Sequence, residues 1–267
     1  MNYGGSSYTY TWTVKKRRGE GAQWLSIAME LADTVAGFGL RVLQICDNLP
    51  LHEIGDEGLF DLNRCCRELG LALQIGTRGL SSKHLALYLN IAELCGAGLV
   101  RTMCPDLEGN ETDAVTAIGE LREICPRYEQ EGVLLAIENH DKNPSEELAF
   151  IARSVGSENV GLCLDTVNSF AALETPEQTI RNMLPLALNI HLKDFDVVRA
   201  NEQMGFSIEG RPLGEGRLRD YLDILLNSRV KDAIVELWTP YQGSLGSTMA
   251  LEAEWAKKSF RFLTSFE

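Results

Sequence analysis

The sequence predicts a single α/β domain over residues 1–267, folded as a closed (β/α)8 barrel. Apolar segments that predict buried strands alternate with helical segments eight times along the 267 residues, and such a barrel needs roughly 250 residues. No change in composition marks a second domain. No Gly-x-Gly-x-x-Gly motif follows the first strand, which argues against an open, dinucleotide-binding sheet.

Eight short apolar segments predict the strands, because parallel strands covered on both faces are apolar along their length. The predicted strands are Asn2–Val14, Arg41–Cys46, Leu71–Ile75, Leu99–Met103, Leu134–His140, Val160–Asp165, Leu188–His191 and Ala233–Glu236. Four cations at residues 15–18 follow the first strand, and we expect them in a solvated loop.

Helical periodicity and terminal signals predict the helices between these strands. Gly70 and Gly132 follow two of them, as glycine often does at a helix C-terminus. Thr175 and Pro176 combine a capping side chain with proline at the first helical position. The predicted helices include Trp24–Phe38, Leu59–Leu69, Ser81 or Ser82 to Leu94, Thr112–Gln130, a helix starting at Pro144, Leu218–Leu226 and Ala250–Leu263.

Composition and charge restrict the partners of the protein. The net charge of −13 repels phosphate backbones, so we expect no nucleic acid. No apolar segment is long enough to span a membrane, and the N-terminus lacks the features of a signal peptide. The seven cysteines lie mostly in apolar contexts, which is typical of reduced thiols. These features predict a cytoplasmic protein.

Four consecutive predicted strands end in a residue that can bind a metal ion: Glu138, Asp165, His191 and Glu236. The carboxyl ends of barrel strands share one rim, where active sites lie, so we expect these side chains to meet. Carboxylates with one imidazole suit one divalent ion, Mn²⁺ or Mg²⁺ more than Co²⁺ or Zn²⁺.

Each of these residues also has an ordinary structural interpretation. Asp165 would cap the following helix, His191 would be a buried core histidine, and Glu138 would pair with an arginine across the barrel. Each interpretation is the more common case for a single residue. The coincidence of four such residues at one end of consecutive strands favours a shared metal site.

The predicted site suggests chemistry beside a carbonyl group. A divalent ion would act as a Lewis acid on a carbonyl and a neighbouring hydroxyl group, and would stabilise an enediolate. Glu138 and Glu236 would flank the substrate as an acid/base pair, one removing and the other returning a proton. We therefore predict a metal-dependent isomerase or epimerase of a small sugar or keto-sugar.

Further polar residues near the strand ends are candidate substrate contacts. His140 and Asn168 follow the fifth and sixth strands and would contact substrate hydroxyl groups. Lys193 follows the seventh and would neutralise an oxyanion or a carboxylate. Arg211 lies in the segment Met204–Gly216, a predicted mobile loop over the rim, and its planar fork suits a carboxylate or phosphate. An ordinary surface position is an equally good interpretation of Lys193 and Arg211.

Four motifs resemble those of the xylose isomerase-like TIM-barrel superfamily, the sugar isomerases and epimerases together with endonuclease IV. They are Ala-Ile-Glu-Asn-His, Cys-Leu-Asp-Thr-Val-Asn, Ile-His-Leu-Lys-Asp-Phe and Val-Glu-Leu-Trp. The resemblance implies that Glu138, Asp165, His191 and Glu236 bind one divalent metal and that the two glutamates are the acid/base pair. It also implies a homo-oligomer, a dimer or tetramer. Asn168 departs from the pattern, because the 3-epimerases usually have a histidine there.

A narrower resemblance suggests a different reaction. The segments Asp47–Pro50, Gly76–Gly79, Met204–Gly216 and Leu237–Pro240 resemble the subgroup that includes the 3-oxo-isoapionate decarboxylases. Loss of carbon dioxide from a 3-oxo sugar acid also yields a metal-held enediolate, so the same site would serve a lyase. In that alternative Arg78, Lys193 or Arg211 would bind the carboxylate.

Two other classes complete the alternatives. An endonuclease of this superfamily needs a cluster of metals and several further histidines, whereas the chain has only His52, His84, His140 and His191; together with the negative charge, this argues against that class. A catalytically silent barrel that binds a sugar would be distinguished by a lack of bound metal.

Overall fold

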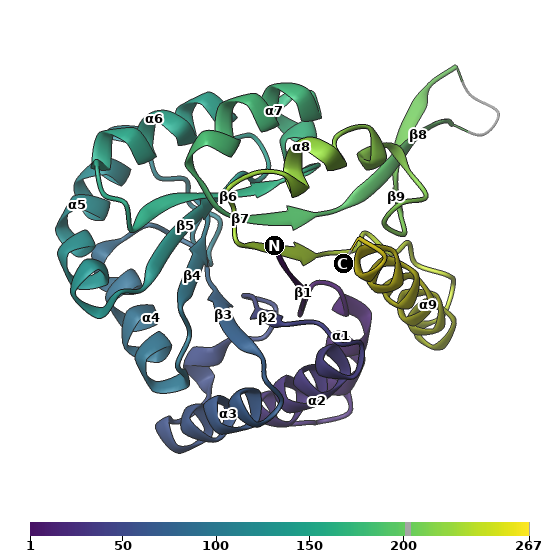
Figure 1. Cartoon of the computed structure of the whole chain (residues 1–267), viewed down its shortest axis with the longest axis horizontal. Coiled ribbons are helices and arrows are strands. Elements are labelled where there is room, and N and C mark those ends of the chain that lie inside the picture. Colours follow the sequence, from purple (N-terminus) through teal and green to yellow (C-terminus); the bar gives the residue numbers. More distant parts are fainter. Residues whose placement is uncertain (201–203, 267) are drawn as a thin grey trace.

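The computed structural model describes residues 1–200 and 204–266, and its centre is a closed barrel of eight parallel strands (Figure 1). The strands follow the order β1-β10-β7-β6-β5-β4-β3-β2 around the barrel. They are β1 (Asn2–Ser6), β2 (Val42–Ile45), β3 (Ala72–Gly76), β4 (Leu99–Thr102), β5 (Leu134–Glu138), β6 (Val160–Asp165), β7 (Ala187–Leu192) and β10 (Asp232–Val235). The predicted (β/α)8 barrel is confirmed.

Helices surround the barrel and cover its strands (Figure 1). They are α1 (Thr11–Gly19), α2 (Trp24–Gly37), α3 (Asp56–Glu68), α4 (Ser82–Cys95), α5 (Ala114–Glu131), α6 (Ser145–Val155), α7 (Pro176–Met183), α8 (Leu222–Leu226) and α9 (Leu245–Thr264). The side chains of Ser81 and Thr175 cap α4 and α7 by accepting backbone hydrogen bonds. The cap predicted at Thr175 and the helix start predicted at Ser81 or Ser82 are confirmed. Short 3₁₀ turns occupy Leu51–Glu53, Asn168–Ala172, Leu184–Leu186 and Arg217–Asp220.

The first strand is shorter than predicted, and the four cations that follow it lie in α1, so the predicted loop is wrong. The reason is a contact that is remote in sequence. Glu252 of α9 accepts hydrogen bonds from the backbone N–H groups of Trp12 and Thr13, at 2.7 and 3.0 Å. The helix N-terminus is thus capped without a local capping residue, and Arg17 pairs with Glu30 on the neighbouring helix.

The segment after β7 forms a hairpin, so the predicted loop at Met204–Gly216 is wrong for Phe206–Arg211, which form a strand. β8 (Asp194–Arg199) pairs antiparallel with β9 (Phe206–Arg211) and projects from the barrel (Figure 1). Asp194 holds the base of the hairpin by accepting hydrogen bonds from the backbone N–H groups of Gly214 and Gly216, at 2.8 and 3.0 Å.

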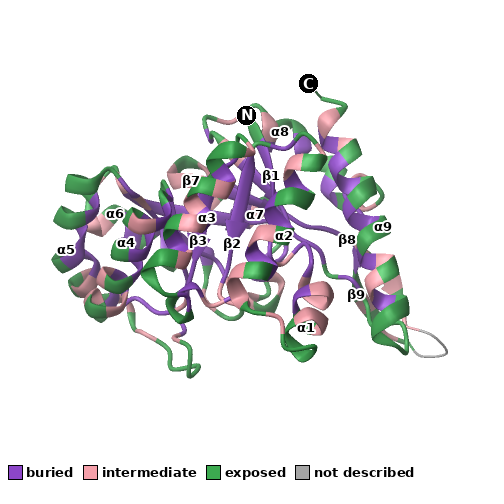
Figure 2. Cartoon of the chain, turned by 90° about the horizontal axis from the view of Figure 1, so that it is seen from below, coloured by how far each residue is buried: buried purple, intermediate pink, exposed green. Residues whose placement is uncertain are grey.

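The barrel wall separates an apolar layer from a polar one. Outward-facing residues such as Leu43 and Ile45 are buried against the helices, and the buried strands stand out in Figure 2. Inside the barrel, Gln44 Nε2 donates to Gln74 Oε1 at 3.0 Å, and Asn189 Nδ2 donates to the same oxygen at 2.8 Å. These hydrogen bonds offset the cost of burying the amides. They create a fixed polar layer beneath the rim.

All seven cysteines are free in the structure. Cys163 lies inside the barrel and donates to Asn189 Oδ1, which connects it to the amide layer. None of the helices in the described ranges combines the length and hydropathy that crossing a bilayer requires.

Candidate active site

The four predicted metal ligands meet at the carboxyl ends of the strands. Glu138 ends β5, Asp165 ends β6, His191 lies in β7, and Glu236 directly follows β10. One ligand atom from each lies within 4.8 Å of the others, and all four residues are buried. Because buried carboxylates at this spacing repel one another, such a cluster requires positive charge between or beside them.

The orientation of His191 fits a metal ion. Its Nε2 lies 2.7 Å from Gln44 Oε1. Because the Nε2 group of Gln44 donates to Gln74, the Gln44 atom that faces His191 is the oxygen, which accepts. The Nε2 therefore carries a proton, and Nδ1 points into the cluster. Nδ1 lies 3.4 to 3.8 Å from oxygens of Glu138, Asp165 and Glu236. It has no hydrogen-bond partner among the described residues, which is the arrangement of a metal-binding histidine with its supporting acceptor.

Lys193 supplies one positive charge to the cluster. Its Nζ lies 2.7 Å from Asp165 Oδ2 and 2.9 Å from Glu236 Oε2. Burial by itself would lower the pKa of Lys193, but these two carboxylates outweigh burial and hold that pKa well above its usual value. Lys193 is therefore an ammonium at the floor of the site and not the surface lysine of the alternative interpretation.

Arg101, which was not among the predicted site residues, supplies a second positive charge. Its Nε donates to Glu138 Oε2, and its Nη1 donates to Asp47 Oδ1 at 3.1 Å. Burial would raise the pKa of Glu138, but Arg101 and then His191 outweigh it and hold that pKa well below its usual value. Glu138 thus pairs with an arginine, as its non-metal interpretation predicted, and it also lies within the cluster of candidate metal ligands. The sequence signal that could have identified Arg101 is a charged residue in the middle of an otherwise apolar predicted strand.

Asn168 bridges Lys193 and Glu138. Its Nδ2 donates to Glu138 Oε1 at 2.8 Å, and its Oδ1 accepts from Lys193 Nζ at 3.3 Å. Both oxygens of Glu138 therefore have donors. An asparagine can bridge a carboxylate and an ammonium in this way because it offers both a donor and an acceptor.

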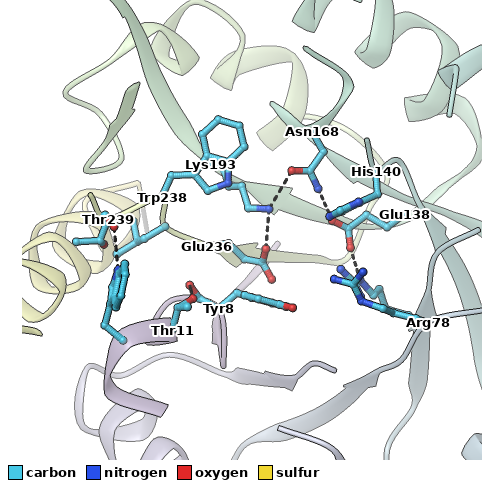
Figure 3. Close-up of a pocket in the computed structure, with 13 residues that line it drawn as sticks. Tyr8, Thr11, Arg78, Glu138, His140, Asn168, Lys193, Glu236, Trp238 and Thr239 are labelled. Atoms are coloured by element: carbon cyan, nitrogen blue, oxygen red, sulfur yellow. Dashed lines mark hydrogen bonds and ion pairs between the residues drawn. The ribbon is translucent and has the colours of Figure 1, made fainter. Parts of the chain in front are cut away.

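A pocket of about 430 Å³ opens above this cluster (Figure 3). Of the predicted residues, Glu138, Glu236, His140, Asn168, Lys193 and Arg78 line it, while Asp165 and His191 are fully buried beneath. Arg211 is not among the described residues of its wall. It lies in β9 and donates to Glu209 at 3.1 Å, so the structure does not bring it to the site.

Aromatic side chains form the wall opposite Arg78. Trp238 and Thr239 lie there in Figure 3, and Trp12 Nε1 donates to the Thr239 carbonyl oxygen at 2.9 Å. Trp12 is held in turn by the Glu252 contact at the start of α1. These residues were not predicted as part of the site, because they come from opposite ends of the chain and no local motif connects them.

Comparison with known proteins decides the family. Residues 76–266 match the family model of the xylose isomerase-like TIM barrel. The chain belongs to this family. It is 33% identical over 267 residues to the 3-oxo-isoapionate decarboxylase of Pectobacterium atrosepticum, covering 98% of this chain and 95% of that protein. Both predicted resemblances are therefore confirmed.

Solved structures show the same fold at lower identity. D-psicose 3-epimerase in the presence of D-fructose has a TM-score of 0.67 and 17% identity, covering 99% of this chain and 97% of that one. A xylose isomerase-like TIM-barrel protein from Mycobacterium smegmatis, in complex with magnesium, has a TM-score of 0.64 and 18% identity, covering 89% of each chain. The family and its characterised relatives are enzymes that include epimerases, isomerases and a decarboxylase.

Proposed function

We propose that the protein is a divalent-metal-dependent decarboxylase of a small 3-oxo sugar acid such as 3-oxo-isoapionate. The observation that carries the proposal is the way Glu138 is held. Arg101 and Asn168 occupy its two oxygens, so it is poorly placed to remove a proton from a substrate carbon. Isomerisation through two bases needs such a proton acceptor, whereas decarboxylation removes no proton from carbon. The similarity to the decarboxylase supports the same choice.

Glu138, Asp165, His191 and Glu236 would hold the ion, and the oxygen-rich ligand set favours Mg²⁺ or Mn²⁺. When bound, the ion supplies Lewis acidity at the keto oxygen and a neighbouring hydroxyl group. The magnesium bound to the Mycobacterium smegmatis protein supports this assignment. The buried position of the cluster keeps water from competing with the substrate oxygens.

The remaining chemistry follows from residues of the chain. The C1–C2 bond of the 3-oxo acid breaks, its electron pair moves toward the keto oxygen, and carbon dioxide leaves. Lys193, an ammonium within 3 Å of two ligand carboxylates, stabilises the charge that develops on the substrate oxygens. It then delivers the proton that C2 requires, and the product is a ketone. Asn168 holds Lys193 toward the pocket, and His140 at the pocket wall contacts a hydroxyl group.

The second candidate is a sugar epimerase or isomerase with Glu138 and Glu236 as the acid/base pair. Both glutamates line the pocket, which is the specific observation in its favour, and D-psicose 3-epimerase shares the fold.

Proton and carbon NMR in D₂O distinguishes the two reactions. With Mg²⁺ or Mn²⁺ present, we expect a 3-oxo sugar acid to lose its carboxylate carbon and to gain deuterium at C2. Chelation of the metal should stop both changes. If ketoses instead exchange hydrogen beside the carbonyl with every carbon retained, and 3-oxo acids stay intact beyond their spontaneous rate, the epimerase is correct and the decarboxylase is rejected.

A further inference from the structure

One side of the pocket contains a second, separate arrangement of charges. Asp47 follows β2, Arg78 follows β3, and Arg101 lies in β4. These residues come from the strands that precede the four ligand-bearing strand ends, and the proposed metal site uses none of them as a ligand. The side chains of Asp47 and Arg101 are only 7% and 2% exposed, whereas 28% of the Arg78 side chain is exposed.

Asp47 divides its two oxygens between the two arginines. Its Oδ2 accepts from Arg78 Nε at 2.6 Å and from the Tyr8 hydroxyl at 3.0 Å. Its Oδ1 accepts from Arg101 Nη1 at 3.1 Å. One carboxylate therefore fixes an outer arginine at the pocket and an inner arginine that is bonded to Glu138.

Of the candidate cations for a substrate carboxylate, Arg78 has the most capacity left. Lys193 already contacts two carboxylates and Asn168. Arg101 is bonded to Glu138, to Asp47 and to the Thr77 carbonyl oxygen. Arg78 donates its Nε–H to Asp47, and a guanidinium has five N–H donors in a fork that matches a carboxylate. Figure 3 shows Arg78 at the edge of the pocket, near Glu138 and away from Trp238.

The charges of the site favour a ligand with one negative charge. Before the reaction, the carboxylates are Asp47, Glu138, Asp165 and Glu236, and the cations are Arg78, Arg101 and Lys193. These seven groups together carry one negative charge, so a divalent ion would bring the site to one positive charge. A substrate monoanion would then neutralise it, whereas a phosphate dianion or an uncharged sugar would leave a net charge buried.

We propose that Arg78, held by Asp47 and Tyr8, is the carboxylate subsite, and that Asp47 is the positioning residue that sets its geometry. This inference rests on the proposed function, because it gives the carboxylate of the 3-oxo acid a place. The substrate then lies across the pocket, with its carboxylate at Arg78, its keto and hydroxyl oxygens over the ligand cluster, and its remaining carbons toward Trp12 and Trp238.

The role of Arg78 has a kinetic signature. The carboxylate loses its charge as carbon dioxide forms, so the contact with Arg78 is stronger in the ground state than in the transition state. Such a contact supports binding and does not accelerate the bond-breaking step. Loss of Arg78 should therefore raise KM without lowering kcat.

Binding of two unreactive ligands to the metal-loaded protein tests the subsite. The probes are a 3-hydroxy sugar acid, which lacks the keto group and cannot decarboxylate, and its uncharged primary amide. Calorimetry gives the ratio of their dissociation constants. We expect the wild-type protein to prefer the acid about 10- to 100-fold, the size of one charge-assisted contact. Arg78→Gln should bring the ratio near one, and Arg78→Lys should be intermediate.

Asp47→Asn should also remove the preference, because an amide nitrogen would face an arginine donor. Tyr8→Phe should weaken the preference by a smaller factor, since it removes only the hydroxyl group that supports Asp47. Arg211→Gln is the matched control and should keep the full ratio, because Arg211 lies outside the pocket wall. Thermal unfolding of each variant identifies an Asp47→Asn protein that has failed to fold, and the Arg78 and Tyr8 variants then decide.

The result separates this inference from the proposed reaction. If Arg78→Gln keeps the preference for the acid, or if the wild-type protein shows none, the subsite is rejected even when 3-oxo acids are decarboxylated. If the preference depends on Arg78 and Asp47 but no 3-oxo acid loses carbon dioxide, the subsite is supported and the decarboxylase is rejected. A fall in kcat for Arg78→Gln at unchanged KM would contradict the assigned binding role.

Discussion

The rim of the barrel has two halves that are built differently. Around β5, β6, β7 and β10, the residues Glu138, Asp165, His191 and Glu236 lie at or next to the strand ends, and their ligand atoms converge within 4.8 Å. From β2 to β4, charged residues form a linked row in which Asp47 joins Arg78 and Arg101. The first half suits a metal ion and the second an anionic group.

The halves meet at Glu138, which is bonded to Arg101 and lies within the ligand cluster. The difference between the halves shows how one fold can serve several reactions. In our proposal, a ligand set at fixed strand ends would provide enediolate chemistry, and the neighbouring strand ends would select the charged group that the substrate must carry. The following changes are designed to separate the two halves.

The largest effect should come from His191→Ala, which removes a ligand from the metal half. We expect the affinity for Mn²⁺ or Mg²⁺ to fall more than about 100-fold, beyond the effect of losing a supporting residue, and activity to be lost. Metal content after dialysis measures this. His52→Ala, at an exposed histidine outside the ligand cluster, is the matched control. Unchanged metal content in the His191 variant would reject the metal site.

Lys193→Met should separate chemistry from metal binding. We expect kcat to fall by about 10²- to 10⁴-fold, the usual contribution of a proton donor, while the metal stays bound. Lys83→Met, an exposed lysine on α4, should leave kcat unchanged. A Lys193 variant with normal kcat and altered KM alone would show that Lys193 only binds substrate.

Gln44→Leu should show that a residue of β2 orients a ligand of the metal half. The change leaves the Nε2–H of His191 without its acceptor, and residues in this position typically contribute about 10- to 100-fold to metal affinity. Metal titration followed by calorimetry measures the loss, and Gln130→Leu on the exposed face of α5 is the control. Equal affinity in the wild type and the Gln44 variant would mean that Gln44 does not orient His191.

The smallest effect should come from Glu252→Gln, outside both halves. An uncharged side chain would still cap α1 but with weaker hydrogen bonds, so we expect a loss of about 1 kcal/mol, which corresponds to about 2–4 °C in Tm. Glu254→Gln, exposed on the same helix, should change Tm less. If Glu252→Gln instead lowers activity below that of the wild type and leaves Tm unchanged, the capping role is wrong, and the variant acts by displacing Trp12.

The metal half was predictable because its signal is local. Each ligand directly follows or ends an apolar strand, and the barrel geometry brings strand ends together. The fold was predictable for the same reason, since eight alternations of an apolar strand segment with a helical segment indicate a (β/α)8 barrel. The resemblance added Arg78 as a candidate cation, but neither motif nor spacing showed which cation remains available in the folded protein.

Three other features were not predictable, because they depend on contacts remote in sequence. Arg101 lies in the middle of an apolar strand, and only the positions of Glu138 and Asp47 explain its burial. The cap of α1 comes from a residue 240 positions away. Arg211 had suitable chemistry but lies in β9 beside Glu209, because the predicted loop is a hairpin.

The most direct test of the divided rim is the distance between the metal and the substrate carboxylate. With Mn²⁺ bound, a 3-hydroxy sugar acid labelled with ¹³C at each carbon reports these distances, because paramagnetic relaxation falls steeply as a nucleus lies farther from the ion. We expect the carbon bearing the C3 hydroxyl group to relax fastest and the carboxylate carbon to relax more slowly, as a carboxylate at Arg78 requires. A carboxylate carbon that relaxes fastest would place that group on the metal and contradict the division of the rim.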